Sequence, residues 1–338
     1  MTTIKDIADI VGVSTATVSY VLNGKKKVSK ETELKVMQAV KQMDYTPNLP
    51  ARSLRKNKTN LIGLVVPDIR NPFYPDLAKG CEDCASQNGY DLLVYNSDDQ
   101  HEKTNRILDK LAENRVDGIL IASAREGDQE RISRLLKKRY PVVLAHRRLE
   151  NIKISEVTTN QVKAALNVTN YIIQNGHRNI VFIKGVDGSS INADRTTGFL
   201  KAIRENKSLI SKYQFIDNCY TYSDSYIRVK ELFKDNKQFP TAIVAYNDLV
   251  AYGAMDAVAD LGLTIPEDVS IVGFDDLIFS SNRRIKLTTV STPRYEIGNE
   301  AMKLLINMIE EDNSASDIQR IVLDTKLMVR GTVSISKK

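Results

Sequence analysis

Four residues that suit ligand binding, Asn71-Pro72-Phe73-Tyr74, follow the first strongly apolar run of this 338-residue chain, Leu61 to Val66. An amide next to aromatic rings suits a sugar, because the amide can hydrogen-bond to its hydroxyls while its C–H face packs on a ring. The same residues suit the start of a helix, where Pro fits the first turn and the aromatic side chains form a hydrophobic staple. Both interpretations stay open from these residues alone.

The sequence offers no pattern typical of an enzyme or a metal centre. It contains no glycine-rich dinucleotide motif, no P-loop, no H-E-x-x-H and no G-x-S-x-G. Cys81 and Cys84 spell C-x-x-C, but they fall inside an expected helix, next to two acids and without a second cysteine pair. His101, His146 and His177 are dispersed. We therefore predict a protein that is not an enzyme and needs no metal or cofactor.

Positive charge is concentrated at the N-terminus. Residues 1–60 hold 11 Lys or Arg against 5 Asp or Glu, an excess that equals the net charge of +6 of the whole chain. Such a segment is expected to bind a polyanion, although scattered solubilising charge is the alternative.

Three short helices are expected in this basic segment. The first is indicated by apolar residues at helical spacing, namely Ile4, Ile7, Ala8 and Val11. Ser14 can then cap a second helix, whose inward side chains are Val18, Val21 and Leu22. The third, Glu31 to Met43, has an apolar stripe of Leu34, Met37, Ala39, Val40 and Met43.

The first two helices and their tight turn predict a helix-turn-helix, whose second helix enters the major groove of DNA. Thr15, Ala16 and Tyr20 point away from Val18 and Val21, so they form the expected reading face.

The segment from Thr3 to Asn23 resembles, nearly position for position, the N-terminus of the lactose repressor (LacI/GalR) family of bacterial transcription regulators. The resemblance continues through Tyr45-Thr-Pro-Asn48 and Ala51-Arg-Ser-Leu54, which is similar to the family's hinge helix, and to the end of the chain. It implies that two hinge helices fold on operator DNA, where each Leu54 wedges into a minor-groove base step. The DNA-binding residues are then expected to be Thr15, Ala16, Tyr20, Lys26, Tyr45, Asn48, Ala51, Leu54 and Arg55.

Beyond Leu61, short apolar runs alternate with longer amphipathic segments. The expected strands are 61–66, 90–95, 118–122, 142–145, 180–183, 214–217, 242–245 and 270–274, with a last strand-like run over 328–335. The expected helices are 76–88, 103–114, 161–174 and 248–260. Two doubly wound α/β units follow, with a ligand cleft where their strand ends face each other.

The resemblance implies a fold of class α/β: an N-terminal all-α helix-turn-helix domain and a periplasmic-binding-protein-like core of two doubly wound parallel-sheet lobes. The chain would cross between these lobes near Thr159, Val290 and Leu323. The expected domains are 1–47 (helix-turn-helix), 48–60 (hinge helix and linker), 61–159 with 291–322 (N-terminal lobe) and 160–290 with 323–338 (C-terminal lobe).

The resemblance implies that Arg195, which precedes Gly198-Phe199, and the strand-end residues Asn247 and Asp275 occupy positions where relatives bind effector hydroxyls or anions. The full set of expected effector-binding residues is Asn71, Phe73, Tyr74, His146, Arg147, Ser189, Arg195, Tyr220, Asn247 and Asp275. His146-Arg147 stands where ribose-type relatives usually carry Asp-Arg. This pair would suit a sugar acid or sugar phosphate, and a solvated charged pair is the alternative, so the effector stays open.

We interpret the chain as a sequence-specific repressor of carbohydrate-utilisation genes, controlled by a sugar or sugar derivative between the lobes. One alternative is a global catabolite regulator with a phosphorylated carrier protein as corepressor, since Tyr220-Thr-Tyr222 and Asn96-Ser-Asp98 partly resemble that branch. A solute-binding protein is a further alternative, but it would need an export signal that we do not find.

The expected partners include pseudo-palindromic operator DNA and a second copy of the chain, because one helix-turn-helix reads only one half-site. No leucine heptads of the kind found in tetrameric relatives follow the last strand-like run, so we expect a homodimer. Three cysteines, no membrane-spanning run and no signal peptide predict a bacterial cytoplasmic protein without membrane contact, at the nucleoid when bound to DNA.

Overall fold

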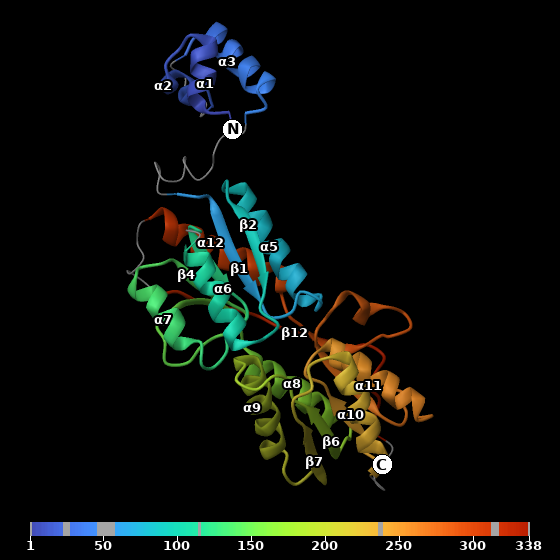
Figure 1. Cartoon of the computed structure of the whole chain (residues 1–338). Coiled ribbons are helices and arrows are strands. Elements are labelled where there is room, and N and C mark those ends of the chain that lie inside the picture. The colour runs from blue at the N-terminus through green and yellow to red at the C-terminus, as the bar shows by residue number, and fades with distance from the viewer. Residues whose placement is uncertain are drawn as a thin grey trace. The chain divides into compact units, whose positions relative to one another are not determined.

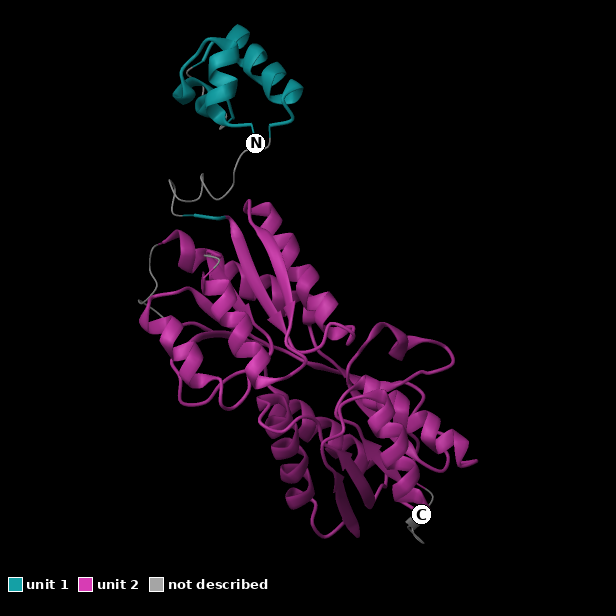
Figure 2. Cartoon of the chain, in the orientation of Figure 1, with its two compact units in different colours: residues 1–59 teal, residues 60–338 magenta. Residues whose placement is uncertain are grey.

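The computed structural model describes residues 2–22, 28–45, 58–113, 116–235, 239–311 and 318–336. The chain forms two compact units, residues 1–59 and 60–338 (Figures 1 and 2). None of the described helices has the length and apolar character that a membrane crossing requires.

The described residues of unit 1 form three helices, α1 (Ile4–Val11), α2 (Thr15–Leu22) and α3 (Lys30–Gln42). Side-chain oxygens cap their N-termini: Thr3 shares a capping box with Asp6, and the hydroxyl of Ser14 accepts the amide N–H of Thr17 at 3.1 Å. The three helices bury one small core, made of Ile7, Ala8, Val18, Val36 and Ala39.

The predicted apolar stripe of α3 is wrong at two positions. Leu34 and Met37 are 65% and 50% exposed, whereas Val36 is fully buried. Val36 and Ala39 are three residues apart and so lie on one side of the helix, but Leu34 is two residues from Val36 and faces away. The inward stripe therefore begins at Val36.

Unit 2 contains two six-stranded sheets. The first has the order β11-β5-β4-β3-β1-β2, with β1 (Leu61–Val66), β2 (Asp91–Asn96), β3 (Gly118–Ile121), β4 (Val142–Ala145), β5 (Ser155–Thr159) and β11 (Arg320–Leu323). The second has the order β12-β10-β9-β8-β6-β7, with β6 (Asn179–Ile183), β7 (Lys212–Ile216), β8 (Ala242–Val244), β9 (Ser270–Asp275), β10 (Thr288–Ser291) and β12 (Lys326–Met328). All pairs are parallel except β10 with β12.

Helices cover both faces of each sheet (Figure 1). We call the first sheet with α5 (Phe73–Gln87), α6 (His101–Glu113), α7 (Gln129–Lys137) and α12 (Arg294–Glu310) the first lobe. The second lobe is the second sheet with α8 (Gln161–Gln174), α9 (Ser190–Glu205), α10 (Tyr222–Asp235), α11 (Asp248–Asp260) and the short 3-10 helix η1 (Ile278–Ser281). Leu64 packs in the core cluster that includes α5 and α12, whereas Val65 packs in the cluster that includes α6 and α7. The predicted fold class is confirmed.

Parts of both sheets differ from the prediction. Strand β5 was not predicted, because Ser155-Glu-Val-Thr-Thr159 is mostly polar, yet all five residues are buried in the interior of the sheet. The strand expected over 328–335 ends at Met328. Beyond it, two hydrogen bonds join Thr332 to Ile271 of β9, and no regular ladder is formed. The carbonyl of Thr332 accepts the amide N–H of Ile271, and the hydroxyl of Thr332 donates to the carbonyl of Ile271.

Candidate functional site

Helix α2 presents three of the expected DNA-binding residues to solvent. Thr15, Ala16 and Tyr20 are exposed, whereas Val18 of the same helix is fully buried. Tyr45 instead packs partly against the core of unit 1, after the end of α3. The remaining predicted DNA-binding residues, Lys26, Asn48, Ala51, Leu54 and Arg55, lie outside the described residues.

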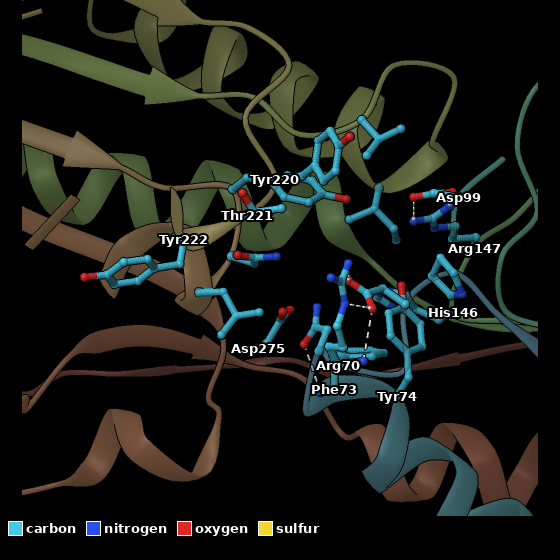
Figure 3. Close-up of a pocket in the computed structure, with 18 of the residues that line it drawn as sticks. Arg70, Phe73, Tyr74, Asp99, His146, Arg147, Tyr220, Thr221, Tyr222 and Asp275 are labelled. Carbon is cyan, nitrogen blue, oxygen red and sulfur yellow. Dashed lines mark hydrogen bonds and ion pairs between the residues drawn. The ribbon is translucent and has the colours of Figure 1, made fainter. Parts of the chain in front are cut away.

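A cavity of about 350 Å³ lies between the two lobes (Figure 3). Nine of the ten predicted effector-binding residues line it, namely Asn71, Phe73, Tyr74, His146, Arg147, Arg195, Tyr220, Asn247 and Asp275. Ser189 does not: it lines a separate hollow, and its hydroxyl is buried without a hydrogen-bond partner among the described residues. Parallel strands explain the gathering, because their carboxyl ends share one edge of each sheet.

The segment after β1 both starts a helix and lines the cavity. The carbonyl oxygen of the Asn71 side chain accepts the amide N–H of Phe73 at 3.0 Å, where α5 begins. The rings of Phe73 and Tyr74 meet edge to face with centroids 5.1 Å apart, and the Phe73 ring lies 4.3 Å from the His146 ring. The two interpretations of these residues are therefore compatible.

Arg195 of α9 is almost entirely buried, and other groups of the second lobe hold its guanidinium. Nε donates to the side-chain oxygen of Gln161 at 2.8 Å, and Nη1 donates to the main-chain carbonyl of Tyr246. Nη2 donates to Oδ1 of Asp275 at 3.2 Å, while the guanidinium carbon lies 4.2 Å from the centre of the Phe274 ring. Arg195 thus joins the loop after β8 to the end of β9 beside the cavity.

Asp275 ends β9 in an unusual backbone conformation, with φ at 108°. Burial raises the pKa of its carboxyl, and the positive charges of Arg195 and Arg294 oppose that rise. Asn247, at the end of the neighbouring strand, uses its side-chain oxygen to cap α11 through the amide N–H of Val250 at 2.9 Å. The capping bond fixes the amide of Asn247 at the cavity wall.

Arg147 forms a second buried ion pair, with Asp99 of the loop after β2. Its two terminal nitrogens donate to the two carboxylate oxygens at 2.7 and 2.8 Å. Although burial opposes it, the Asp99 carboxylate raises the pKa of Arg147. Burial, followed by the charges of Arg195 and Arg147, holds the pKa of His146 well below its usual value, so this imidazole is neutral at neutral pH.

Several lining residues were absent from the sequence prediction, including Arg70, Asp99, Tyr222 and Tyr246. Asp99 follows the end of a predicted strand, as Asp275 does, and Tyr246 directly precedes Asn247. The strand-end argument that selected Asp275 and Asn247 could therefore have selected these two residues.

Asp248 lies behind the cavity wall, fully buried at the start of α11. Its carboxylate accepts the hydroxyl of Ser280 at 2.5 Å, the hydroxyl of Thr289 at 2.6 Å and the amide N–H of Leu277 at 2.8 Å. Burial and then the charge of Asp275 raise its pKa to about 7, against these hydrogen bonds.

This raised pKa predicts that stability falls with rising pH. Between the ordinary value of 3.8 and about 7, the folded chain holds the Asp248 proton more tightly than the unfolded chain does. The contribution is therefore complete below pH 3.8 and is lost as the pH rises through about 7, with a slope of roughly 1 kcal/mol per pH unit. Urea unfolding should show this slope from pH 5 to about 7 in the native chain, and less of it in Asp248→Asn. An equal reduction in Asp256→Asn, which changes an exposed carboxyl of the same helix, would contradict the assignment.

Comparison with known proteins identifies both units. Residues 3–48 match the family of bacterial regulatory proteins, lacI family, and residues 59–328 match the periplasmic binding proteins and sugar binding domain of LacI family. The chain is 35% identical to catabolite control protein A of Priestia megaterium, covering 94% of this chain and 96% of that one. It is 36% identical to the ribose operon repressor of Halalkalibacterium halodurans, covering 98% and 97%. The lac repressor dimer bound to operator and the anti-inducer ONPF shares the fold, with a TM-score of 0.85, 23% identity and coverage of 98% and 99%.

Proposed function

The chain belongs to the lacI family of bacterial regulatory proteins, and on this premise we propose that it represses carbohydrate-utilisation genes in response to a sugar or sugar derivative. It is a DNA-binding transcription regulator and not an enzyme. The observation that carries the proposed effector class is the cavity between the lobes, where aromatic rings and hydrogen-bonding groups converge. We place the protein in the bacterial cytoplasm, at the nucleoid when it is bound to DNA.

The effector would act by changing the arrangement of the two lobes. The cavity is lined by Phe73 and Tyr74 from the first lobe and by Tyr220, Asn247 and Asp275 from the second (Figure 3). A ligand that contacts both walls favours one lobe arrangement by its difference in affinity for the alternatives. That change would alter the spacing of the two hinge helices and so the affinity for the operator.

Regulators of this family bind operator DNA and act as dimers, so we propose a pseudo-palindromic operator read by one α2 helix in each half-site. Thr15, Ala16 and Tyr20 would contact bases there. Lys26, Tyr45 and Asn48 would contact the DNA backbone and so position the protein. Ala51, Leu54 and Arg55 would enter the minor groove. The domain boundaries and site residues expected from the sequence are part of this proposal.

A global catabolite regulator is the second candidate function. The likeness to catabolite control protein A, at 35% identity over 94% of the chain, favours it. In that case a phosphorylated carrier protein would act as corepressor, in place of or together with the cleft ligand.

Fluorescence anisotropy of operator-sized DNA from the region upstream of the gene tests the proposal. We expect a neutral or phosphorylated sugar to change the DNA affinity of the full chain by roughly 5- to 150-fold, the usual range for coupled sites. A shuffled DNA of equal length is the control. An affinity that changes only with a phosphorylated carrier protein would support the second candidate, and an affinity that responds to neither would contradict both.

A further inference from the structure

Each charged side chain in the wall of the cleft cavity stands next to an opposite charge in the same wall. Arg147 pairs with Asp99 at 2.7 and 2.8 Å, and Arg195 pairs with Asp275 at 3.2 Å. The third pair, at the exposed edge, joins Arg70 to both oxygens of Asp68 at 2.9 and 3.0 Å. The six side chains therefore contribute three positive and three negative charges, and the neutral His146 adds none.

Breaking either of the two inner ion pairs would cost much free energy, because both pairs are buried. The side chains of Arg147 and Asp99 are 4% and 15% exposed, and those of Arg195 and Asp275 are 1% and 6% exposed. A phosphate or carboxylate that bonded to the terminal nitrogens of either guanidinium would compete with the carboxylate of the pair, and displacing that carboxylate would leave it buried without its partner. Bonding to Arg147 Nε, which has no hydrogen-bond partner among the described residues, would leave the pair with Asp99 intact. In either position the anionic ligand would stand close to the negative charge of that carboxylate, at a place where water screens little.

Asp99 is fixed in place by the main chain around it. It follows β2 with φ at 54°, a left-handed conformation that Asp tolerates better than most residues. Its carbonyl accepts a hydrogen bond from the guanidinium of Arg125, whose other terminal nitrogen donates to the carbonyl of Asp187 in the second lobe at 2.7 Å. The adjacent Asp98 has nearly the same φ of 53°, but its carboxylate pairs with Lys103 on the surface and does not line the cavity.

We propose that the cleft selects a small uncharged, hydroxylated ligand over the phosphorylated or carboxylated form of the same molecule, with Asp99 as a specificity-determining residue. This inference rests on the proposed function, because it concerns the ligand of the same cleft. Hydroxyls can accept from a guanidinium N–H and donate to a carboxylate without separating the pair. The volume of about 350 Å³, near the lower end of ligand pockets, suits a small molecule. The anionic ligand that His146-Arg147 suggested in the sequence is thereby disfavoured, because Asp99 already occupies the two terminal nitrogens of Arg147.

Isothermal titration of the full chain with matched compounds tests this selection. The probes are ribose with ribose 5-phosphate, glucose with glucose 6-phosphate, and glucose with gluconate. We expect at least one neutral sugar to bind, and its anionic counterpart to bind more than tenfold more weakly. Asp99→Asn keeps the shape of the side chain but leaves the charge of Arg147 without compensation. It should therefore shift the ratio of the two affinities by roughly ten- to a hundred-fold toward the anionic compound, as a charge-assisted hydrogen bond allows.

Asp98→Asn is the matched control, since it removes a carboxylate from the next residue but outside the cavity, and its affinity ratio should equal that of the native chain. Asp275→Asn leaves the charge of Arg195 without a carboxylate partner, so it should shift the affinity ratio in the same direction as Asp99→Asn. It serves as the test variant if Asp99→Asn does not fold. The proposal is overturned if the native chain binds an anionic compound as tightly as its neutral counterpart, or binds no neutral sugar. It is also overturned if a folded Asp99→Asn or Asp275→Asn chain keeps the native ratio. Operator binding, measured separately, reports on the proposed function: a chain that selects neutral sugars but binds no operator would contradict that function alone.

Discussion

Arg195→Ala should lower the free energy of unfolding of unit 2 by about 3–5 kcal/mol, because it leaves the buried carboxylate of Asp275 without its main partner. The substitution also removes the hydrogen bonds to the Gln161 side chain and to the carbonyl of Tyr246, and the contact with the Phe274 ring. The loop after β8 and the end of β9 then lose their shared contact. Ligand binding should be lost as well, since Tyr246 and Asp275, which Arg195 holds, both line the cavity.

Urea unfolding followed by circular dichroism measures this loss, and a double-mutant cycle assigns it to the pair. The cycle uses Arg195→Met, Asp275→Leu and both together, so that the double variant buries no unpaired charge. We expect the double variant to be more stable than either single variant. Additive effects, or a loss below about 1 kcal/mol in Arg195→Ala, would show that the pair stabilises the fold little.

The sequence predicted where the cavity wall would be, because a strand end is a local feature. Apolar runs located the strands, and the polar residues after them, such as Asn247 and Asp275, had to lie at the cleft edge. The sequence did not predict that Arg195 and Asp275 pair with each other, since 80 residues separate them. Their contact depends on how α9 packs beside β9, which no local pattern encodes.

The sequence missed a residue of the cavity, Asp99, and wrongly selected another, Ser189, for it. Asp99 was overlooked although it follows a strand, because one Asp after a strand is more often a turn residue than a partner for an arginine. Ser189 was selected by resemblance, yet it lines a separate hollow because the start of α9 places its hydroxyl away from the cleft cavity. In α3, apolar character alone misplaced Leu34 and Met37, since burial depends on which side of the helix faces α1 and α2.

Removal of residues 1–59 should abolish specific binding to the operator, which for such regulators exceeds nonspecific binding by roughly 10³- to 10⁷-fold. The excess of six positive charges lies in residues 1–60, and the exposed face of α2 belongs to the same segment. Residues 60–338 carry both lobes and the whole cavity. The shortened chain should therefore keep the ligand affinity of the full chain.

Salt dependence tests the physical origin of this loss. Each phosphate that a Lys or Arg neutralises releases counterions, so the logarithm of the affinity of the full chain should fall with the logarithm of the salt concentration, by about 0.9 per contact. Anisotropy titrations between 50 and 200 mM salt should show this steep slope for the full chain, and residues 60–338 should show almost no binding at either salt concentration. If the shortened chain bound the operator with the same salt dependence, the phosphate contacts would lie on residues 60–338, although these residues carry no net charge. Loss of operator binding in the shortened chain, together with an unchanged ligand affinity, would assign DNA recognition to the first 59 residues.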